Sequence, residues 1–345
     1  MSKIGLAWAL ARVLMPDALT RAIYAGRLPA VDGRRIDAKA QAVTDLVARL
    51  RDPDAIPTLE ESRAQLLTMA QRLDQPRPAD VTVADITLDG VAGPRRARVY
   101  APPGTDPKTP QATLFYLHGG GWVQGSIETH DGLCGHIAKD AGVRVISYDY
   151  VLAPEHVFPA PPDDVLAAYQ SLLASDLGVT AERLAVGGDS AGANLTAVLM
   201  HDLMAADTPA PAGQVLIYPA VDGRMNSRSH VALAEQPLLP RIRIEWFLDL
   251  YLPEGQDMTD PRVSPVCSDR LAGQPPALIV AGGHDPLWDD GRSYAKALET
   301  AGVPVTFAPY PGQVHAFLSM AKAIGQGRAA RGDVVRWLTA LFAKG

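Results

Sequence analysis

Residues 183–206 read RLAVGGDSAGANLTAVLMHDLMAA, and this stretch decides the fold. Its first four residues form a short, mostly apolar run of the kind found in buried strands. The pentapeptide GDSAG (residues 188–192) follows and matches the pattern G-x-S-x-G, after which a helix-length apolar segment begins. A strand, a sharp bend and a helix in this order lift a serine above the end of a sheet. The stretch therefore predicts a parallel α/β sheet with Ser190 at the carboxyl end of a strand.

The alternation of short apolar runs and helix-length segments continues on both sides of this bend. Continuous apolar character marks strands covered on both faces, and alternating strands and helices imply right-handed crossovers and a doubly wound sheet. We expect a mostly parallel, eight-stranded sheet flanked by helices. The expected strands are 81–88, 96–100, 112–117, 143–148, 183–186, 214–218, 277–281 and 303–308, and the expected helices are 127–141, 163–174, 192–206, 290–301 and 332–343.

Two segments outside this alternation predict a helical cap. The N-terminal segment reads as three helices separated by Pro and Gly turn signals, and the stretch between Tyr218 and Pro276 holds an apolar helical pattern but no clear strand. An insertion at the carboxyl end of a strand lies over any site at that end. The expected units are an N-terminal cap segment at 1–75 with helices 4–15, 38–50 and 59–73, an α/β domain at 76–345, and a cap insertion at about 222–262 with a helix at 239–252.

Composition excludes several classes of partner. Of 345 residues, 47% are apolar and 20% are charged, as in a soluble globular protein. The net charge is −6 without a dense basic run, so nucleic acid is not expected. Cys134 and Cys267 read as reduced thiols outside any metal-ligand spacing, which favours the cytoplasm. Arg12 interrupts the apolar run at 4–10 too early for a signal peptide, and no run approaches the ~20 apolar residues of a membrane span.

Ser190 has two interpretations. A serine at a helix N-terminus can simply cap free N–H groups. The strand before it and the helix after it favour a nucleophile instead, because the helix N-terminus offers N–H groups and a positive dipole end to a developing negative charge. We therefore predict Ser190 as a nucleophile.

A glycine run, His118-Gly119-Gly120-Gly121-Trp122, follows the expected strand at 112–117. Three glycines cost backbone entropy, which indicates that the main chain must approach something closely. A tight turn would also explain the run. We predict instead that the N–H groups of Gly119 and Gly120, with that of Ala191, form an oxyanion hole.

Three further residues are expected to support these motifs without reacting. The His118 imidazole can bond neighbouring backbone and fix the glycine loop. Gly121 belongs to the same loop, and Asp189 is expected to stabilise the bend that carries the serine.

A nucleophilic serine needs a base, and the base needs an acid that orients it. In this type of sheet the chain order is serine, acid, histidine. Of the later histidines, His201 falls within a helix, His230 within the expected cap, and His284 directly before the best acid. His315, in a loop after the last expected strand, is the predicted base.

The acid is expected at the end of the strand 277–281. Asp285 lies there, in Gly282-Gly283-His284-Asp285-Pro286-Leu287. Asp289 and Asp290 are rivals, but they fit the start of the next helix better, where carboxylates bond free N–H groups.

Together these motifs resemble the bacterial hormone-sensitive-lipase-like esterases (family IV, GDSAG type) of the α/β-hydrolase superfamily. The resemblance rests on HGGGW (118–122), YDYVLAPEH (148–156), GDSAG (188–192), DPL (285–287) and HAF (315–317). It implies hydrolysis of short- to medium-chain acyl esters through an acyl-enzyme, without metal or cofactor, with the roles given above. Val151, Ala193 and Gly283 depart from the family's usual arginine, glycine and acidic residue, at positions that support loops and fine specificity.

Alternatives remain on the same triad. An amidase, a lactonase or a carbamate hydrolase would use the same residues, and a non-catalytic ligand-binding protein could share the fold. The glycine loop lacks the G-x-G-x-x-G spacing of a dinucleotide site. Trp122, Trp246 and Phe247 are candidates for an apolar substrate pocket. The expected partner is a small-molecule ester, and the sequence leaves a homodimer open.

Overall fold

The computed structural model describes residues 3–50, 55–206 and 208–343. Within them, eight strands form one sheet in the order β10-β9-β8-β7-β5-β6-β4-β3. The six strands from β10 to β6 run parallel, and β4 and β3 pair antiparallel at one edge. The strands are β3 (Thr82–Gly90), β4 (Gly93–Ala101), β5 (Thr113–Leu117), β6 (Arg144–Tyr148), β7 (Leu184–Asp189), β8 (Gly213–Ile217), β9 (Ala277–Gly282) and β10 (Val305–Tyr310). The expected eight-stranded, mostly parallel sheet is confirmed.

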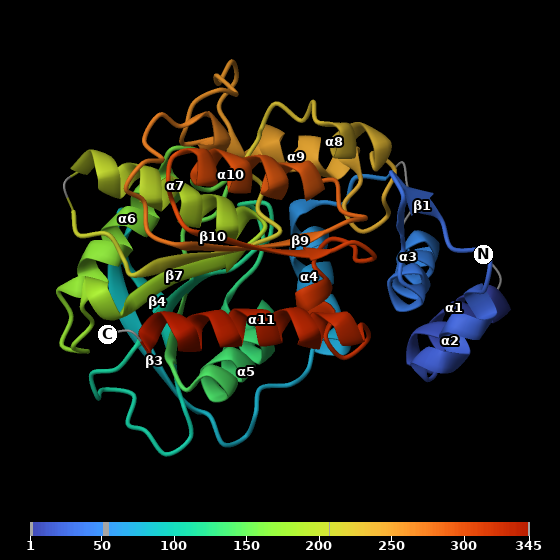
Figure 1. The fold of residues 1–345 in the computed structure, drawn as a ribbon, viewed down its shortest axis with the longest axis horizontal. Coiled ribbons are helices and arrows are strands. Elements are labelled where there is room, and N and C mark those ends of the chain that lie inside the picture. The colour runs from blue at the N-terminus through green and yellow to red at the C-terminus, as the bar shows by residue number, and fades with distance from the viewer. Residues whose placement is uncertain (1–2, 51–54, 207, 344–345) are drawn as a thin grey trace.

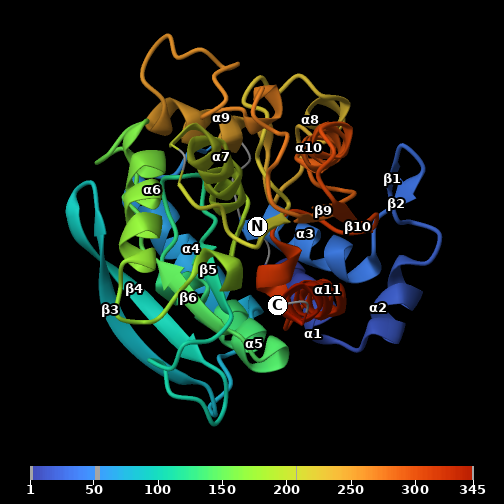
Figure 2. The same ribbon diagram turned by 60° about the vertical axis from the view of Figure 1, so that its left-hand side comes forward.

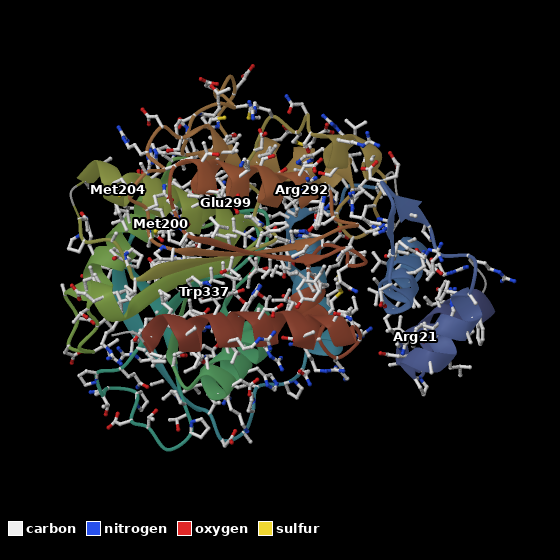
Figure 3. All side chains as sticks on the ribbon, in the orientation of Figure 1. Arg21, Met200, Met204, Arg292, Glu299 and Trp337 are labelled. Carbon is white, nitrogen blue, oxygen red and sulfur yellow. The ribbon has the colours of Figure 1, made fainter. Side chains whose placement is uncertain are left out.

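Helices cover both faces of the sheet (Figure 1). On one face lie α5 (Asp131–Ala141) and α11 (Gly325–Phe342), and on the other lie α6 (Ala160–Leu173), α7 (Ala191–Ala206) and α10 (Trp288–Thr300). Residues of β5, β7 and β8 are fully buried, which explains their continuous apolar sequence. Figure 3 shows Trp337 of α11 beneath the sheet, and its ring leaves no room for a side chain at Gly213 of β8.

The N-terminal segment divides into two parts. Its first part, α1 (Lys3–Leu14), α2 (Asp17–Tyr24), the hairpin β1 (Ala30–Val31) with β2 (Arg34–Arg35), and α3 (Ala38–Leu50), lies at the side opposite the β3–β4 edge (Figure 2). Its second part, α4 (Leu59–Leu73), packs against the 3-10 turns at Ile127–Thr129 and Phe317–Met320. Both α4 and the hairpin therefore reach the carboxyl ends of the strands, since Arg34 of β2 bonds the Gly283 carbonyl directly after β9.

The expected cap insertion at about 222–262 contains the helices α8 (Arg228–Ala232) and α9 (Arg241–Tyr251), and a 3-10 turn at Pro265–Cys267 follows it. The buried face of α9 joins the apolar cluster that also contains Trp122 and residues of α6 and α7. In the part of the chain that the structure describes, none of the helices has the length and apolar character needed to cross a bilayer.

Several elements differ from the expectation. The sequence pattern missed α2, the hairpin and α8, which are too short to show a clear period. The expected helix at 127–141 is divided, because Ser126 caps a separate 3-10 turn. Helix α11 begins at Gly325 and not at residue 332. Its early glycines hide the helix, yet Gly327 is needed, since a Cβ there would lie 2.4 Å from the Phe317 carbonyl oxygen.

Candidate active site

Ser190 lies on the bend between β7 and α7. Its φ of +54° is a left-handed conformation that non-glycine residues seldom adopt. The bend also passes close to the end of β5: a Cβ at Gly188 or Gly192 would lie 2.4 or 2.0 Å from the Leu117 carbonyl oxygen. The two glycines of GDSAG are therefore required by sterics, and the strained serine is held at the carboxyl edge of the sheet.

The structure brings the three predicted triad residues together. Ser190 Oγ lies 3.0 Å from His315 Nε2, and His315 Nδ1 lies 2.7 Å from Asp285 Oδ2. Asp285 is fully buried, and its second oxygen accepts a bond from the Leu287 N–H at 2.9 Å. A carboxylate on Nδ1 fixes the tautomer that carries hydrogen there, so Nε2 faces the serine hydroxyl as an acceptor.

The glycine loop corrects one sequence-based assignment. The Gly119 N–H donates to Asp189 Oδ1 at 2.8 Å, so it is already bonded and does not point to an oxyanion. Gly120 and Gly121 have φ values of +134° and +61°. Among the described residues, their N–H groups have no hydrogen-bond acceptor. Both glycines line the same cavity as Ser190 and Ala191, which moves the candidate donors one residue along the loop.

Asp189 fastens this loop to the nucleophile bend. Its buried carboxylate accepts bonds from the Tyr116 hydroxyl and the Gly119 N–H, both at 2.8 Å, and pairs with His130 Nε2 at 3.0 Å. Burial raises the pKa of Asp189, but His130, Tyr116 and the Gly119 N–H outweigh that effect and hold its pKa below the ordinary value. Sequence reasoning missed His130, because a histidine at the start of a helix gives no signal of a buried ion pair.

His118 contacts the loop that it precedes. Its Nδ1 lies 3.0 Å from the Gly119 carbonyl oxygen, and its ring stacks on Tyr150 with centroids 4.3 Å apart. The Tyr150 hydroxyl donates to the His118 carbonyl at 2.8 Å. Burial lowers the pKa of His118 to about 4, so the ring is neutral at working pH and Nδ1 carries the donated hydrogen.

The loop before Asp285 is held by the N-terminal hairpin. Arg34 Nε donates to the Gly283 carbonyl at 2.9 Å, and His284 Nε2 lies 2.8 Å from the Arg34 carbonyl. The Arg34 guanidinium also lies over the Trp288 ring, 5.0 Å from its centroid. A Cβ at Gly283 would lie 2.2 Å from the Pro311 carbonyl oxygen, so this chain has no room for the acidic residue that is frequent at this position in the resembled family.

A cavity above Ser190 is lined by both expected cap segments. Trp122 and Phe247 line it, as the sequence predicts, but Trp246 does not. Successive helical residues point about 100° apart, and the Trp246 ring lies instead under the Arg243 guanidinium at 4.3 Å. The other lining side chains include Ser62, Gln65, Leu66, Met69 and Ala70 of α4 and Leu238, Leu239, Arg243 and Ile244 of the insertion. In the described ranges, no group of three or more His, Cys, Asp or Glu side chains could hold a metal ion.

Comparisons with known proteins place this geometry in a family. A family model for the alpha/beta hydrolase fold matches residues 114–319. The carboxylic ester hydrolase LipN of Mycobacterium tuberculosis is 36% identical over 339 residues, which cover 94% of this chain and 88% of the relative. The ethyl acetate hydrolase of Pseudomonas putida is 40% identical over 281 residues, covering 80% and 86%.

Solved structures of similar proteins have the same fold. An α/β hydrolase from the metagenome of Lake Arreo superposes with a TM-score of 0.84 at 38% identity, covering 88% of this chain and 98% of the other. An esterase of the bacterial hormone-sensitive lipase family gives 0.78 at 31% identity, with coverages of 88% and 98%.

The fold, the bend at Ser190 and the family match define the class of this protein as an α/β-hydrolase. Within that class the chain belongs to the bacterial hormone-sensitive-lipase-like esterases, as its motifs predict, and it is a carboxylic ester hydrolase.

Proposed function

We propose that this chain is a serine esterase that hydrolyses short- to medium-chain acyl esters through an acyl-enzyme on Ser190. The observation that carries the proposal is the hydrogen-bonded row from Ser190 Oγ through His315 to the buried Asp285, with distances of 3.0 and 2.7 Å. This is the arrangement by which a weakly nucleophilic hydroxyl is activated by a neighbouring base.

In the first step, Ser190 Oγ attacks the ester carbonyl carbon while its proton passes to His315 Nε2. The carbonyl oxygen becomes negatively charged and is stabilised by the N–H groups of Gly120, Gly121 and Ala191. The carbon–oxygen bond to the alcohol then breaks, and the alcohol leaves with the proton from Nε2. Asp285 stabilises the imidazolium that forms between these events.

In the second step, water attacks the acyl-enzyme. His315 Nε2 takes a proton from the water, the same N–H groups stabilise the second tetrahedral intermediate, and Ser190 leaves with the proton from the imidazolium. The carboxylic acid is released and the free enzyme is restored.

The cavity lining supports a limit on acyl length. Phe247 of α9 lies directly on the glycine loop, since a Cβ at Gly121 would be 2.4 Å from the Phe247 ring. Leu66 and Met69 of α4 and Ile244 of α9 add apolar surface to the same cavity. This apolar part of the lining favours acyl chains that fit against it over longer ones.

The test is a series of p-nitrophenyl esters from acetate to palmitate, assayed beside anilides, lactones and carbamates. The proposal predicts the highest kcat/KM among the shorter esters. Preference for an anilide, a lactone or a carbamate would replace it with the corresponding alternative on the same triad. A fluorophosphonate that fails to react would favour a ligand-binding protein.

Assembly and location are proposed separately. The sequence leaves a homodimer open, and light scattering during gel filtration would distinguish it from a monomer. A cytoplasmic location is the expectation from the two thiols, Cys134 and Cys267, which form no disulfide.

A further inference from the structure

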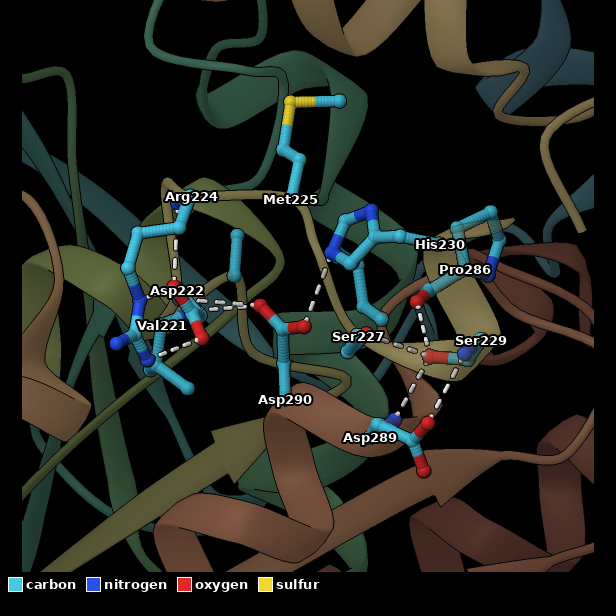
Figure 4. Close-up of polar contacts among 12 residues, drawn as sticks. Val221, Asp222, Arg224, Met225, Ser227, Ser229, His230, Pro286, Asp289 and Asp290 are labelled. Atoms are coloured by element: carbon cyan, nitrogen blue, oxygen red, sulfur yellow. Dashed lines mark hydrogen bonds and ion pairs between the residues drawn. The ribbon is translucent and has the colours of Figure 1, made fainter. Parts of the chain in front are cut away.

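Asp285 lies in the connection between β9 and α10, and we call residues 285–290, which include the first three residues of α10, the acid-bearing turn. Within the turn, the Leu287 N–H bonds Asp285 Oδ1 and so fixes the direction of the carboxylate. The position of the acid therefore depends on what holds the turn in place. The contacts of the turn with the cap insertion are drawn in Figure 4.

Ser229 of α8 forms hydrogen bonds to this turn through both its hydroxyl and its backbone N–H. Its Oγ donates to the Pro286 carbonyl at 2.6 Å and accepts from the Asp289 N–H at 3.1 Å. Its own N–H donates to Asp289 Oδ2 at 2.9 Å. Ser229 is 1% exposed, so water cannot replace these bonds if they are lost.

The next residue, His230, contacts Asp290, the residue that follows Asp289. Its Nε2 lies 3.0 Å from Asp290 Oδ1, and both side chains are buried. Asp290 Oδ2 accepts the N–H groups of Val221 and Asp222, each at 3.1 Å. Burial alone would lower the pKa of His230, but the bond to Asp290 and the charge of Asp290 raise it above the ordinary value. The pair therefore ties α8, the chain after β8 and the start of α10 together.

These contacts change the sequence-based interpretation of the two acids. Asp289 and Asp290 are in the first turn of α10, where they were expected to cap its N–H groups. The residue before α10 is Leu287, which makes no side-chain capping bond, and both carboxylates bond residues of the insertion instead. They keep the favourable position near the positive end of the helix dipole, but their partners are on the insertion.

We propose that Ser229 and His230 are positioning residues for the acid Asp285. Two consecutive residues of the insertion hold two consecutive residues of the acid-bearing turn, so the insertion and the acid move as one unit. This inference rests on the proposed function, because it gives Asp285 its role in orienting His315. It adds that the insertion covers the substrate and also maintains the triad.

This positioning role predicts that substitutions at Ser229 lower kcat and leave KM nearly unchanged. A residue that only shapes the pocket changes KM, since it binds substrate and transition state alike. Loss of the Ser229 hydroxyl releases the Pro286 carbonyl and lets Asp285 shift relative to His315. A shift of about 1 Å in a reacting group costs on the order of 100-fold in rate, so we expect kcat to fall about 10- to 100-fold while KM changes less than twofold.

The experiment compares Ser229→Ala with Ser227→Ala. Ser227 is on the same segment, and among the described residues the one hydrogen-bond partner of its hydroxyl is the Ser229 hydroxyl, at 3.3 Å. For each full-length variant, kcat, KM, the rate of fluorophosphonate labelling and the melting temperature are measured. The proposal predicts that kcat and the labelling rate fall together in Ser229→Ala and stay within twofold in Ser227→Ala. An unchanged kcat with a raised KM in Ser229→Ala would overturn it.

A second pair of variants tests His230. His230→Gln keeps an N–H that can reach Asp290, whereas His230→Leu removes it, so kcat is expected to recover partly in the first and to fall about 10- to 100-fold in the second. Equal kcat values in the two variants would contradict the proposal. Failure of both Ser229→Ala and His230→Leu to fold would also contradict it, because it would assign these residues to the fold and not to the turn.

Ser190→Ala in the same assays separates the two levels of the argument. If Ser190→Ala retains ester hydrolysis, the proposed function fails. If Ser190→Ala is inactive while Ser229→Ala is fully active, only the positioning role fails.

Discussion

The glycine loop and the acid-bearing turn flank the same serine, yet they are held by different parts of the molecule. The Gly119 end of the glycine loop is held by a cluster of buried side chains. They are Tyr116 and Asp189 of the sheet and His130, which directly precedes α5. These residues are buried and lie within a few positions of the motifs that they support. The part of the site that holds Gly119 is therefore continuous with the central core.

The acid-bearing turn is held by residues outside the central sheet and its flanking helices. Arg34 of the N-terminal hairpin bonds Gly283, and Ser229 and His230 of the insertion bond Pro286 and Asp290. These contacts come from the N-terminal segment and the cap insertion, which both lie outside the α/β alternation. The comparison teaches that the acid-bearing turn is bonded by both peripheral segments, whereas the Gly119 end of the glycine loop is bonded by side chains of the core. The peripheral segments contact the glycine loop further on, where Arg63 of α4 donates to the Val123 carbonyl and the Phe247 ring lies against Gly121.

The largest expected effect is on the acid side. Asp285→Asn leaves a side chain of the same shape but favours the wrong tautomer of His315, so kcat is expected to fall by about 10⁴. Steady-state assays with p-nitrophenyl butyrate measure the kcat of the variant and of the wild type. Asp249→Asn, on the exposed face of α9, is the control and should stay within twofold. A loss below tenfold in Asp285→Asn would mean that the acid turn has no part in the chemistry.

The next effect is on the core side. Asp189→Asn keeps an oxygen for the Gly119 N–H but leaves the buried His130 without its carboxylate. The loop is then less well held, and we expect kcat to fall by about 10²–10³, as on loss of an oxyanion donor, with a drop in stability of about 3 kcal/mol. Urea titration and steady-state kinetics check both values. Tyr116→Phe, which removes one bond and no charge, should cost less than tenfold; equal losses in the two variants would contradict the role of the ion pair.

The pH dependence of stability tests the burial of His118 beside the glycine loop without changing the triad. His118 has a pKa of about 4 in the folded chain against 6.5 for an ordinary histidine, so below pH 6.5 the unfolded chain binds a proton that the folded chain does not. This contribution to stability is complete above about pH 6.5 and is lost as the pH falls to about 4, with a total of about 3 kcal/mol. Denaturant titrations of wild type and His118→Asn at pH 7.5, 5.5 and 4.5 measure it. Parallel pH profiles for the two proteins would refute the assignment.

The smallest expected effect lies in the cap. Phe247 lines the cavity and neighbouring Trp246 does not. Phe247→Ala should therefore raise KM for a butyrate ester about three- to tenfold and improve the relative rate on longer esters, because it opens apolar space. Trp246→Ala should leave the chain-length profile unchanged. The same change of profile in both variants would place the acyl chain elsewhere.

The sequence contained enough information for the sheet and for the meeting of the three triad candidates, because both depend on local patterns. A continuous apolar run predicts a buried strand, and the order of Ser190, Asp285 and His315 predicts their convergence at the carboxyl ends of strands. The candidate oxyanion donors differ between the two, because the sequence predicts Gly119 and Gly120 and the structure favours Gly120 and Gly121. The glycine motif shows that the backbone is exposed there, but only the fold shows that Asp189 already binds the Gly119 N–H.

The residues that hold the acid turn could not be predicted from pattern. Arg34 and Gly283 are 249 positions apart, and Ser229 and Pro286 are 57 apart. A single arginine or serine in a short element has no period and matches no motif, so its partner becomes known only when the chain is folded. The early start of α11 was hidden for a different reason, because the glycine that closely approaches Phe317 also lowers helix propensity.

The most direct test of the central claim is to locate the covalent adduct after treatment with a fluorophosphonate. The account predicts one adduct per chain, on the peptide that contains Ser190, formed at the rate at which esterase activity disappears. Complete inhibition with an unmodified Ser190, or full activity after Ser190 is modified, would contradict it.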